Sequence, residues 1–413
     1  MPIPRATYRL QFNEHFRLVD ALALVPYLSD LGVSHIYASP LFKAVPHSLH
    51  GYDVCDFTKL NPELGTEADL ERLVSALHAW KMGLILDIVP NHMGIASPEN
   101  FWWWDVLKNG RASRFAGYFD IDWKSSDPKL TGKILLPVLG GKYETLLHQG
   151  EFQILKAEGG LVLGYHEHHF PLAAKTVVNL HADAPGLKKV NSDFAALDQL
   201  IRRQNYHLEF YAQGDSKLNY RRFFAVSSLA AVRVEDEKVF QATHAPVRRW
   251  LKKGWLDGLR VDHPDGLWDP EQYLRRLRAL APKAWIVVEK ILEPGECLPA
   301  SWPVRVWLCG LTLPPLGRAA RCAVRAAGGG AKATRVDVSV SRSARRTRAV
   351  TPQRGVICRQ PGWLPPQWRR ATGTENDDPA CKLNRPNYKV VVWACKFGHR
   401  NCKFGQRNCK LAC

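Results

Sequence analysis

Apolar positions in the first ninety residues alternate between two spacings, one typical of strands and one typical of helices. Short apolar runs predict three strands, at residues 7–12 (TYRLQF), 34–38 (SHIYA) and 84–89 (LILDIV). Helical spacing predicts two helices, at residues 19–31 and 67–80, with Thr66 as the N-cap of the second. The third strand is almost wholly apolar, as is typical of a parallel strand that is covered on both faces.

The same alternation returns after a long interruption. Residues 93–219 are rich in Trp, Asp, His and Gly, include the run FWWW at 101–104, and predict a large irregular insertion that contacts substrate. Helices are then expected at residues 245–253 and 270–280, and strands at residues 256–261 and 285–291. Five strands by residue 291 predict an α/β fold, either a doubly wound sheet or a (β/α)₈ TIM barrel. The first strand is followed by no glycine-rich phosphate loop, which argues against a nucleotide-binding sheet.

Charge and cysteine divide the chain at one point. Residues 1–304 contain 35 Lys and Arg against 35 Asp and Glu, whereas residues 305–413 contain 22 against 4, so the whole net charge of +18 lies in the last quarter. Eight of the ten cysteines lie in that quarter too, and helical or strand periodicity fades there. We therefore expect a basic, cysteine-rich tail that is distinct from the rest.

The first 304 residues indicate a cytoplasmic enzyme. They contain two cysteines, Cys55 and Cys297, which suits a reducing compartment better than a disulfide scaffold. The opening residues lack the apolar core of a signal peptide, and the chain has no apolar run of the roughly 18 residues that would span a bilayer. We expect neither a membrane nor a nucleic-acid partner, and the oligomeric state is left open.

Two acidic residues lie at the carboxyl ends of consecutive predicted strands. Asp262 follows the strand at 256–261, and Glu289 lies near the end of the next one. Parallel neighbours are about 4.8 Å apart, so the two carboxylates should face the same mouth of a barrel at roughly 5 Å. A retaining glycosidase needs this separation, because one carboxylate attacks the anomeric carbon and the other protonates the leaving oxygen.

The letters around these positions carry a family resemblance. Residues 87–92 (DIVPNH), 258–263 (GLRVDH) and 288–290 (VEK) match three signatures of the α-amylase superfamily in order, each at a strand end. Further matching segments lie at residues 6–12 (ATYRLQF), 37–40 (YASP), 50–54 (HGYDV), 218–224 (LNYRRFF) and 259–269 (LRVDHPDGLWD). Over residues 3–304 the chain resembles the maltooligosyltrehalose synthase family of glycoside hydrolase family 13.

That resemblance implies a function and a site. The family moves the reducing-end glucose of an α-1,4-glucan into an α,α-1,1 trehalose linkage, an intramolecular transglycosylation that needs no cofactor and no metal. Asp262 would be the nucleophile, Glu289 the general acid/base, and Arg260 would keep Asp262 ionised. Substrate contacts are expected from four further side chains, namely Tyr52, Asp53, His92 and His263. The partner would be a maltooligosaccharide. The aromatic side chains around Trp102–Trp104 would either line a closed acceptor pocket or be buried structural residues.

The resemblance stops at Val304, where the family would begin its sixth barrel strand. The third catalytic carboxylate of the superfamily has no counterpart in residues 305–413, because Asp337, Asp377 and Asp378 have the wrong neighbours. The tail could be a nucleic-acid-binding extension, a zinc module on Cys395, Cys402, Cys409, Cys413 and His399, or sequence read out of frame. The simultaneous change in charge, cysteine content and periodicity favours the third interpretation.

The domain prediction follows from these boundaries. Residues 1–92 begin a partial TIM barrel, residues 93–219 form the insertion, residues 220–304 continue the barrel, and residues 305–413 form the aberrant tail. This form of the chain is expected to be truncated and inactive. Alternatives are another hydrolase of α-1,4-glucans from the same superfamily and a glucan-binding remnant without catalysis.

Overall fold

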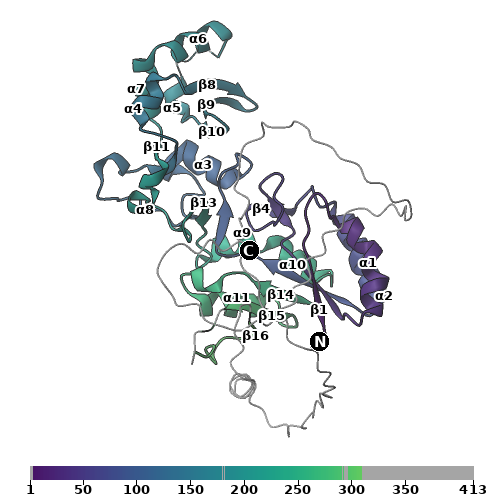
Figure 1. Cartoon of the computed structure of the whole chain (residues 1–413). Helices are drawn as coiled ribbons and strands as arrows, with labels where there is room; N and C mark the ends of the chain where they lie inside the picture. The colour runs from purple at the N-terminus through teal and green to yellow at the C-terminus, as the bar shows by residue number, and fades with distance from the viewer. Residues whose placement is uncertain (1–2, 179, 181, 291, 293–295, 309–413) are drawn as a thin grey trace, which may run out of the picture. The chain divides into compact units, whose positions relative to one another are not determined.

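A parallel sheet of six strands organises the part of the chain that the computed structural model describes, which is residues 3–178, 180, 182–290, 292 and 296–308 (Figure 1). Its strands, in spatial order, are β1 (Thr7–Leu10), β2 (His35–Ala38), β5 (Gly83–Ile88), β14 (Gly258–Val261), β15 (Trp285–Lys290) and β16 (Arg305–Leu308). Every neighbouring pair is parallel. Strands β2, β5 and β14 are buried along their whole length, which explains their nearly continuous apolar sequences.

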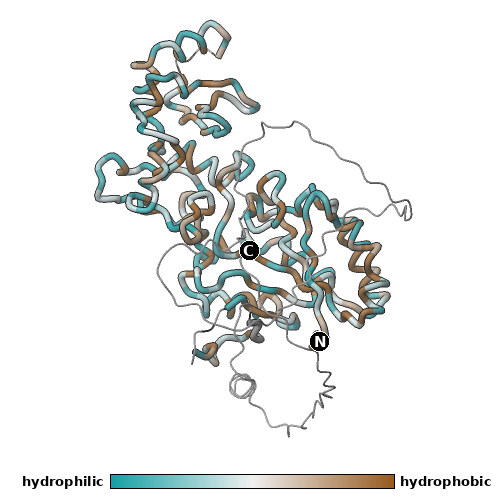
Figure 2. Tube along the Cα trace, viewed as in Figure 1, coloured by the Kyte–Doolittle hydropathy of each residue, from teal (hydrophilic) through white to brown (hydrophobic). Residues whose placement is uncertain are grey.

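Helices connect these strands as the apolar spacing predicted. They are α1 (Leu18–Asp30), α2 (Glu67–Ala79), α10 (Ala245–Lys252) and α11 (Pro270–Leu280). The N-cap prediction for α2 is confirmed, since Thr66 accepts a hydrogen bond from the backbone of Asp69 while the Asp69 carboxylate accepts one from the backbone of Thr66. Hydrophobic residues recur along α1 and α2 (Figure 2). In α2 the buried ones are Leu70, Leu73, Val74 and Leu77.

Strand order follows chain order in this sheet, with helical crossovers, which is the arrangement of a partial (β/α)₈ barrel. Five barrel strands were predicted, and the structure adds a sixth. β16 lies parallel to β15, with Glu289 opposite Trp307, so the sheet extends past the predicted boundary at residue 304. The remaining tail, with its cysteines, its repeat and its three aspartates, lies outside the described residues.

The insertion is not irregular, and that prediction is wrong. Its elements are β6 (His92–Gly94), α3 (Phe101–Asn109), η1 (Gly110–Ala112), η2 (Pro128–Leu130), β7 (Ile134–Leu139), α4 (Tyr143–His148), β8 (Phe152–Ala157), β9 (Gly160–Tyr165), β10 (His168–Pro171), α5 (Ala174–Val177), α6 (Ala184–Ser192), α7 (Phe194–Arg202), β11 (Tyr206–Phe210), η3 (Tyr211–Gln213) and α8 (Gly214–Lys217). An antiparallel sheet of β8, β9 and β10 and a parallel pair of β7 and β11 organise them. These strands are four to six residues long, and β7 is buried almost throughout, so it lacks a period-two pattern.

Smaller elements complete the described part. They are β3 (Phe42–Ala44), β4 (Val54–Leu60), β12 (Arg222–Phe223), β13 (Val226–Ala231), α9 (Glu237–Thr243) and η4 (Pro264–Gly266). β13 pairs with β6 and with β12, so the segment after the insertion is tied back to the loop that follows β5. Within the described residues, no helix has both the length and the hydrophobicity to cross a membrane.

Two buried tryptophans of α3 pack against other aromatic rings of the insertion. Trp102 is 3% exposed, its ring is stacked at 5.8 Å on Phe115, and it meets Tyr118 edge-on at 4.9 Å. Trp103 is 2% exposed and meets Phe119 edge-on at 4.9 Å. Both rings therefore belong to a packed core, as expected if these tryptophans are buried structural residues rather than a pocket wall.

Replacing Trp102 with Ala should destabilise the protein by about 3–5 kcal/mol, because it removes a fully buried ring from an aromatic cluster. The matched control is Trp268→Ala, which removes a ring that is 75% exposed and should change stability by less than about 0.5 kcal/mol. Urea unfolding followed by far-UV circular dichroism measures both. Equal stabilities for the two variants would contradict the assignment of Trp102 to the core.

Candidate active site

Three acidic residues meet where three neighbouring strands end. Asp87 lies in β5, Glu289 lies in β15, and Asp262 directly follows β14, which is the strand between those two. In the register of β14 and β5, Arg260 lies opposite Asp87. The last residue pair of β14 and β15 is Val261 with Val288, so the next residues, Asp262 and Glu289, lie side by side. The carboxylates thus gather at the carboxyl edge of the sheet, where (β/α)₈ barrels carry their sites.

One buried guanidinium holds all three carboxylates. Arg260 Nη1 donates to Asp262 Oδ1 at 2.7 Å and to the two oxygens of Asp87 at 2.8 and 3.0 Å. Arg260 Nη2 lies 3.0 Å from Glu289 Oε1. Asp87, Arg260 and Asp262 are buried, and the Glu289 side chain is 27% exposed. The structure therefore brings Asp262, Glu289 and Arg260 together, with the two carboxylates on different nitrogens of the same guanidinium.

Three carboxylates around one cation leave surplus negative charge. Burial raises the pKa of Asp262 well above its usual value, the charges of Asp87 and Glu289 add to the rise, and Arg260 opposes it. Arg260 makes the charge-assisted hydrogen bond that was predicted, and its charge lowers the pKa of Asp262 against the effects of burial and like charge. Such a cluster is suited to a reaction in which positive charge develops beside it.

Two phenols and a second arginine complete the surroundings of Asp87. The hydroxyls of Tyr37 and Tyr52 each donate to Asp87 Oδ2 at 2.6 Å. Arg9 Nη2 donates to the Tyr52 hydroxyl at 3.1 Å, and its guanidinium carbon lies 5.5 Å from the centroid of the Tyr37 ring. Burial and the charge of Asp87 raise the pKa of both phenols, so both remain protonated donors. Asp87 is thus a fully hydrogen-bonded centre of the network.

Tyr52 and Asp53 are neighbours in sequence with different surroundings. Tyr52 directs its hydroxyl to Asp87, and its ring is only partly buried. Asp53 accepts a hydrogen bond from Ser48 Oγ at 2.5 Å and lies 3.8 Å from His50 Nδ1. The structure connects Tyr52 to the Arg260 network, whereas the described contacts of Asp53 are within its own loop.

His92 is neutral and buried. Burial lowers its pKa to about 3, its Nε2 lies 3.2 Å from the backbone oxygen of Tyr52, and its Nδ1 lies 3.2 Å from Asn91 Nδ2. These partners fit a proton on Nε2 that is donated to Tyr52 and a bare Nδ1 that accepts from Asn91. The predicted donor to a sugar is therefore directed at a carbonyl, and His92 supports the backbone of Tyr52.

His263 reaches the cluster through its backbone. Its N–H donates to Glu289 Oε2 at 3.2 Å, so both oxygens of Glu289 are held, one by Arg260 and one by His263. The backbone of His263 adopts φ 44°, in the left-handed region that is rare for a residue with a side chain. Its ring centroid lies 4.9 Å from those of both Phe223 and Phe224.

Arg221 connects the site to the insertion, and sequence reasoning gave it no role. Arg221 Nη1 donates to Asn91 Oδ1 at 3.1 Å and to the backbone oxygen of Gly266 at 2.5 Å, while its Nε lies 2.9 Å from Asp120 Oδ2. A Cβ at Gly266 would lie 2.6 Å from Asn91 Oδ1 and closer still to the His263 ring, so a side chain there would displace them. Arg221, Arg9 and Tyr37 all lie in segments that match the family, at residues 218–224, 6–12 and 37–40. Their spacing in the sequence did not show which residues they would hydrogen-bond.

Known proteins resemble this chain over most of its described part. The family description "Alpha amylase, catalytic domain" matches residues 22–142. A putative maltooligosyl trehalose synthase of Mycobacterium tuberculosis is 44% identical over 306 residues, which cover 72% of this chain. The matched part of the chain belongs to the maltooligosyltrehalose synthase family.

Solved structures of this family resemble the chain as well. The maltooligosyltrehalose synthase from Arthrobacter ramosus is 44% identical with a TM-score of 0.64, over 73% of this chain and 37% of that one. The hypothetical maltooligosyl trehalose synthase of Sulfolobus tokodaii is 36% identical with a TM-score of 0.61, over 74% and 38%. The chain thus spans little more than a third of the length of these maltooligosyltrehalose synthases, and covers 36% of the Mycobacterium tuberculosis relative.

The raised pKa of Asp262 predicts a pH dependence of stability. The folded chain binds this proton more tightly than the unfolded chain, so the free energy of unfolding should fall as pH rises above the unfolded value near 4. Asp262→Asn should remove this contribution, and the variant should be more stable than the parent at pH 7.

Urea unfolding of both proteins between pH 4 and 8 measures the difference. Glu158→Gln, which changes an exposed carboxylate between β8 and β9, is the control and should follow the parent. A gap between the parent and Asp262→Asn that stays constant across this range would contradict the prediction.

Proposed function

We propose that residues 3–308 are the first part of the catalytic barrel of a maltooligosyltrehalose synthase, a (1→4)-α-D-glucan 1-α-D-glucosylmutase. The observation that carries this proposal is the attachment of Asp262 and Glu289 to two nitrogens of Arg260 at the ends of adjacent strands. Two carboxyl groups held so near each other suit a reaction with retention at the anomeric carbon. The enzyme class is an isomerase that acts by intramolecular transfer.

The first half of the reaction breaks the glycosidic bond next to the reducing-end glucose. Asp262 attacks the anomeric carbon of the penultimate sugar, and a glycosyl–Asp262 ester forms as the C–O bond to the terminal glucose breaks. Glu289 gives its proton to the departing oxygen, so the terminal glucose leaves neutral. The proton that burial favours on Asp262 must move to Glu289 before the attack, and the surplus negative charge then stabilises the oxocarbenium-like transition state.

The second half joins the same two sugars in a new way. The retained glucose turns and presents its own anomeric hydroxyl, Glu289 removes that proton, and the hydroxyl oxygen displaces Asp262 from the glycosyl ester. Two inversions give net retention and an α,α-1,1 linkage, and Asp262 and Glu289 return to their starting states. The sequence also requires that water stays out while the glucose is held.

Of the residues predicted to contact substrate, Tyr52 is proposed to touch the sugar, and the others support it or Glu289. Tyr52 offers a partly exposed ring, with its hydroxyl fixed on Asp87, for stacking on a sugar in front of Asp262. His92 acts through Tyr52, and His263 acts through Glu289, so both are positioning residues. Asp53 holds the loop that carries Tyr52. The glucan substrate is the maltooligosaccharide class.

A chimeric enzyme tests the site in a complete barrel. Residues 1–304 of this chain would precede the remainder of the Arthrobacter ramosus relative, which is 44% identical over the shared part. With maltopentaose we expect loss of reducing ends without release of sugar. Glu289→Gln should lower kcat by about 10²–10⁴-fold, and Asp262→Asn should abolish turnover.

The alternatives give different products in that assay. New reducing ends would indicate a hydrolase of α-1,4-glucans. Binding of maltopentaose without any effect of Asp262→Asn would indicate a non-catalytic remnant, and a slow-reacting fluoro-sugar would then leave no glycosyl adduct on the chain. Glu158→Gln in the chimera is the matched control and should retain full activity.

The chain by itself is proposed to be inactive. The described sheet has six of the eight strands that close a barrel, and its end strands β1 and β16 each pair on one side within the described residues. We expect no conversion of maltopentaose and concentration-dependent association in light scattering. A soluble monomer that produces a trehalose-ended sugar would contradict this.

The tail interpretation has its own test. The out-of-frame interpretation was made for residues 305–413, and we propose it for the residues after β16, which the unmatched quarter of the chain supports. The coding DNA around codons 300–310 should then regain a long family-like frame after a shift of one or two bases.

A further inference from the structure

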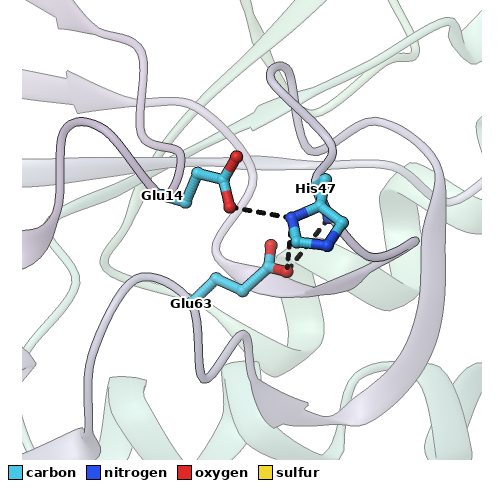
Figure 3. A group of neighbouring side chains, drawn as sticks. All are labelled: Glu14, His47 and Glu63. Carbon is cyan, nitrogen blue, oxygen red and sulfur yellow. Dashed lines mark hydrogen bonds and ion pairs between the residues drawn. The ribbon is translucent and has the colours of Figure 1, made fainter.

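A histidine and two glutamates from three separate loops converge on one point (Figure 3). Glu14 lies between β1 and α1, His47 between β3 and β4, and Glu63 between β4 and α2. Their nearest ligand atoms all lie within 4.8 Å of one another. The proposed reaction uses none of the three, and sequence spacing did not indicate them.

The distances suit a small divalent ion. His47 Nδ1 lies 2.8 Å from Glu14 Oε2 and 4.0 Å from Glu63 Oε1. Ligands of a tetrahedral zinc ion, each about 2.0–2.2 Å from the metal, are separated from one another by about 3.4 Å. The two observed distances lie on either side of that value, so modest side-chain rotations would produce the required triangle.

The charges favour a cation as well. Two carboxylates face one imidazole, and in this structure the Glu14 carboxylate accepts a hydrogen bond from His47 Nδ1. A divalent ion would replace that imidazole proton, which leaves to solvent, and would balance both carboxylates. Nitrogen from histidine with carboxylate oxygen suits zinc and similar transition metals better than magnesium or calcium.

We propose that Glu14, His47 and Glu63 form a binding site for a divalent transition metal of the zinc type, with water in the fourth position. The backbone of His47 orients one ligand, because its N–H donates to Glu63 Oε1 at 3.0 Å. His47 itself has φ 62°, and this left-handed conformation holds it at the start of the loop that continues to Tyr52. The ion would therefore connect the segments after β1 and β4 with the loop that carries Tyr52.

The chain offers a close control for His47. His166 also has a positive φ of 49°, is largely exposed, and lies 2.9 Å from a carboxylate, that of Glu151. It differs in facing one glutamate where His47 faces two. A general affinity of exposed histidines for metal would affect both residues equally.

Equilibrium dialysis of the full chain against Zn²⁺, with metal analysis of the protein, tests the site. The parent and His166→Ala should each bind one more ion per chain than His47→Ala and Glu14→Gln. The ten cysteines are present in all four proteins, so zinc bound to thiols contributes equally and cancels in the comparison. Far-UV circular dichroism checks the fold of each variant, and Glu14→Gln preserves the test if His47→Ala fails to fold.

Equal ion counts for the parent and Glu14→Gln would overturn the proposal, as would an equal loss in His166→Ala. Neither result depends on catalysis, so the metal site and the proposed function can fail separately.

Discussion

The guanidinium of Arg260 is the interaction on which the proposed active site depends. It reaches Asp87, Asp262 and Glu289 from one buried position, and each of these carboxylates comes from a different strand end. Buried charges are stable only when they are paired and hydrogen-bonded, so the parallel register of β5, β14 and β15 and this ion network require one another. A slip of one residue in β14 would turn Arg260 to the other face of the sheet.

Each carboxylate of the network has a hydrogen-bond or ion-pair partner, but one guanidinium does not balance the charge of three carboxylates. Phenols from Tyr37 and Tyr52 add hydrogen bonds to Asp87, and the backbone of His263 adds one to Glu289, yet none of these supplies a positive charge. Burial raises the pKa of Asp262 despite its short contact with Arg260, and the remaining imbalance of charge adds to the rise. It also gives the site a physical reason to favour a cationic transition state over a neutral ground state.

Loops of very different length deliver these groups. Tyr52 comes from the β3–β4 segment and is supported by His92, whereas Arg221 ties the end of the insertion to Asn91 and to the turn at Gly266. The insertion thus contributes to the site through positioning, and its tryptophans contribute through packing. One ligand of the proposed metal site, His47, lies on the same loop as Tyr52, so a bound ion would tie that loop to the segments that carry Glu14 and Glu63.

The sequence alone determined the order of barrel strands and helices, because long apolar periods and caps such as Thr66 depend on near neighbours. It also placed Asp262, Glu289 and Arg260 at strand ends, since three short motifs fall there. Four features came only from the tertiary structure. They are the direction of the Asp262 pKa shift, the hydrogen bond from His92 to the backbone of Tyr52, the packing of Trp102 on Phe115, and the hydrogen bonds of Arg221 to Asn91 and Gly266. Each of these is set by groups that are distant in sequence, and local patterns carry no information about such distances. The sixth strand was missed for the same reason, since β16 is recognised by its pairing with β15 and not by its own composition.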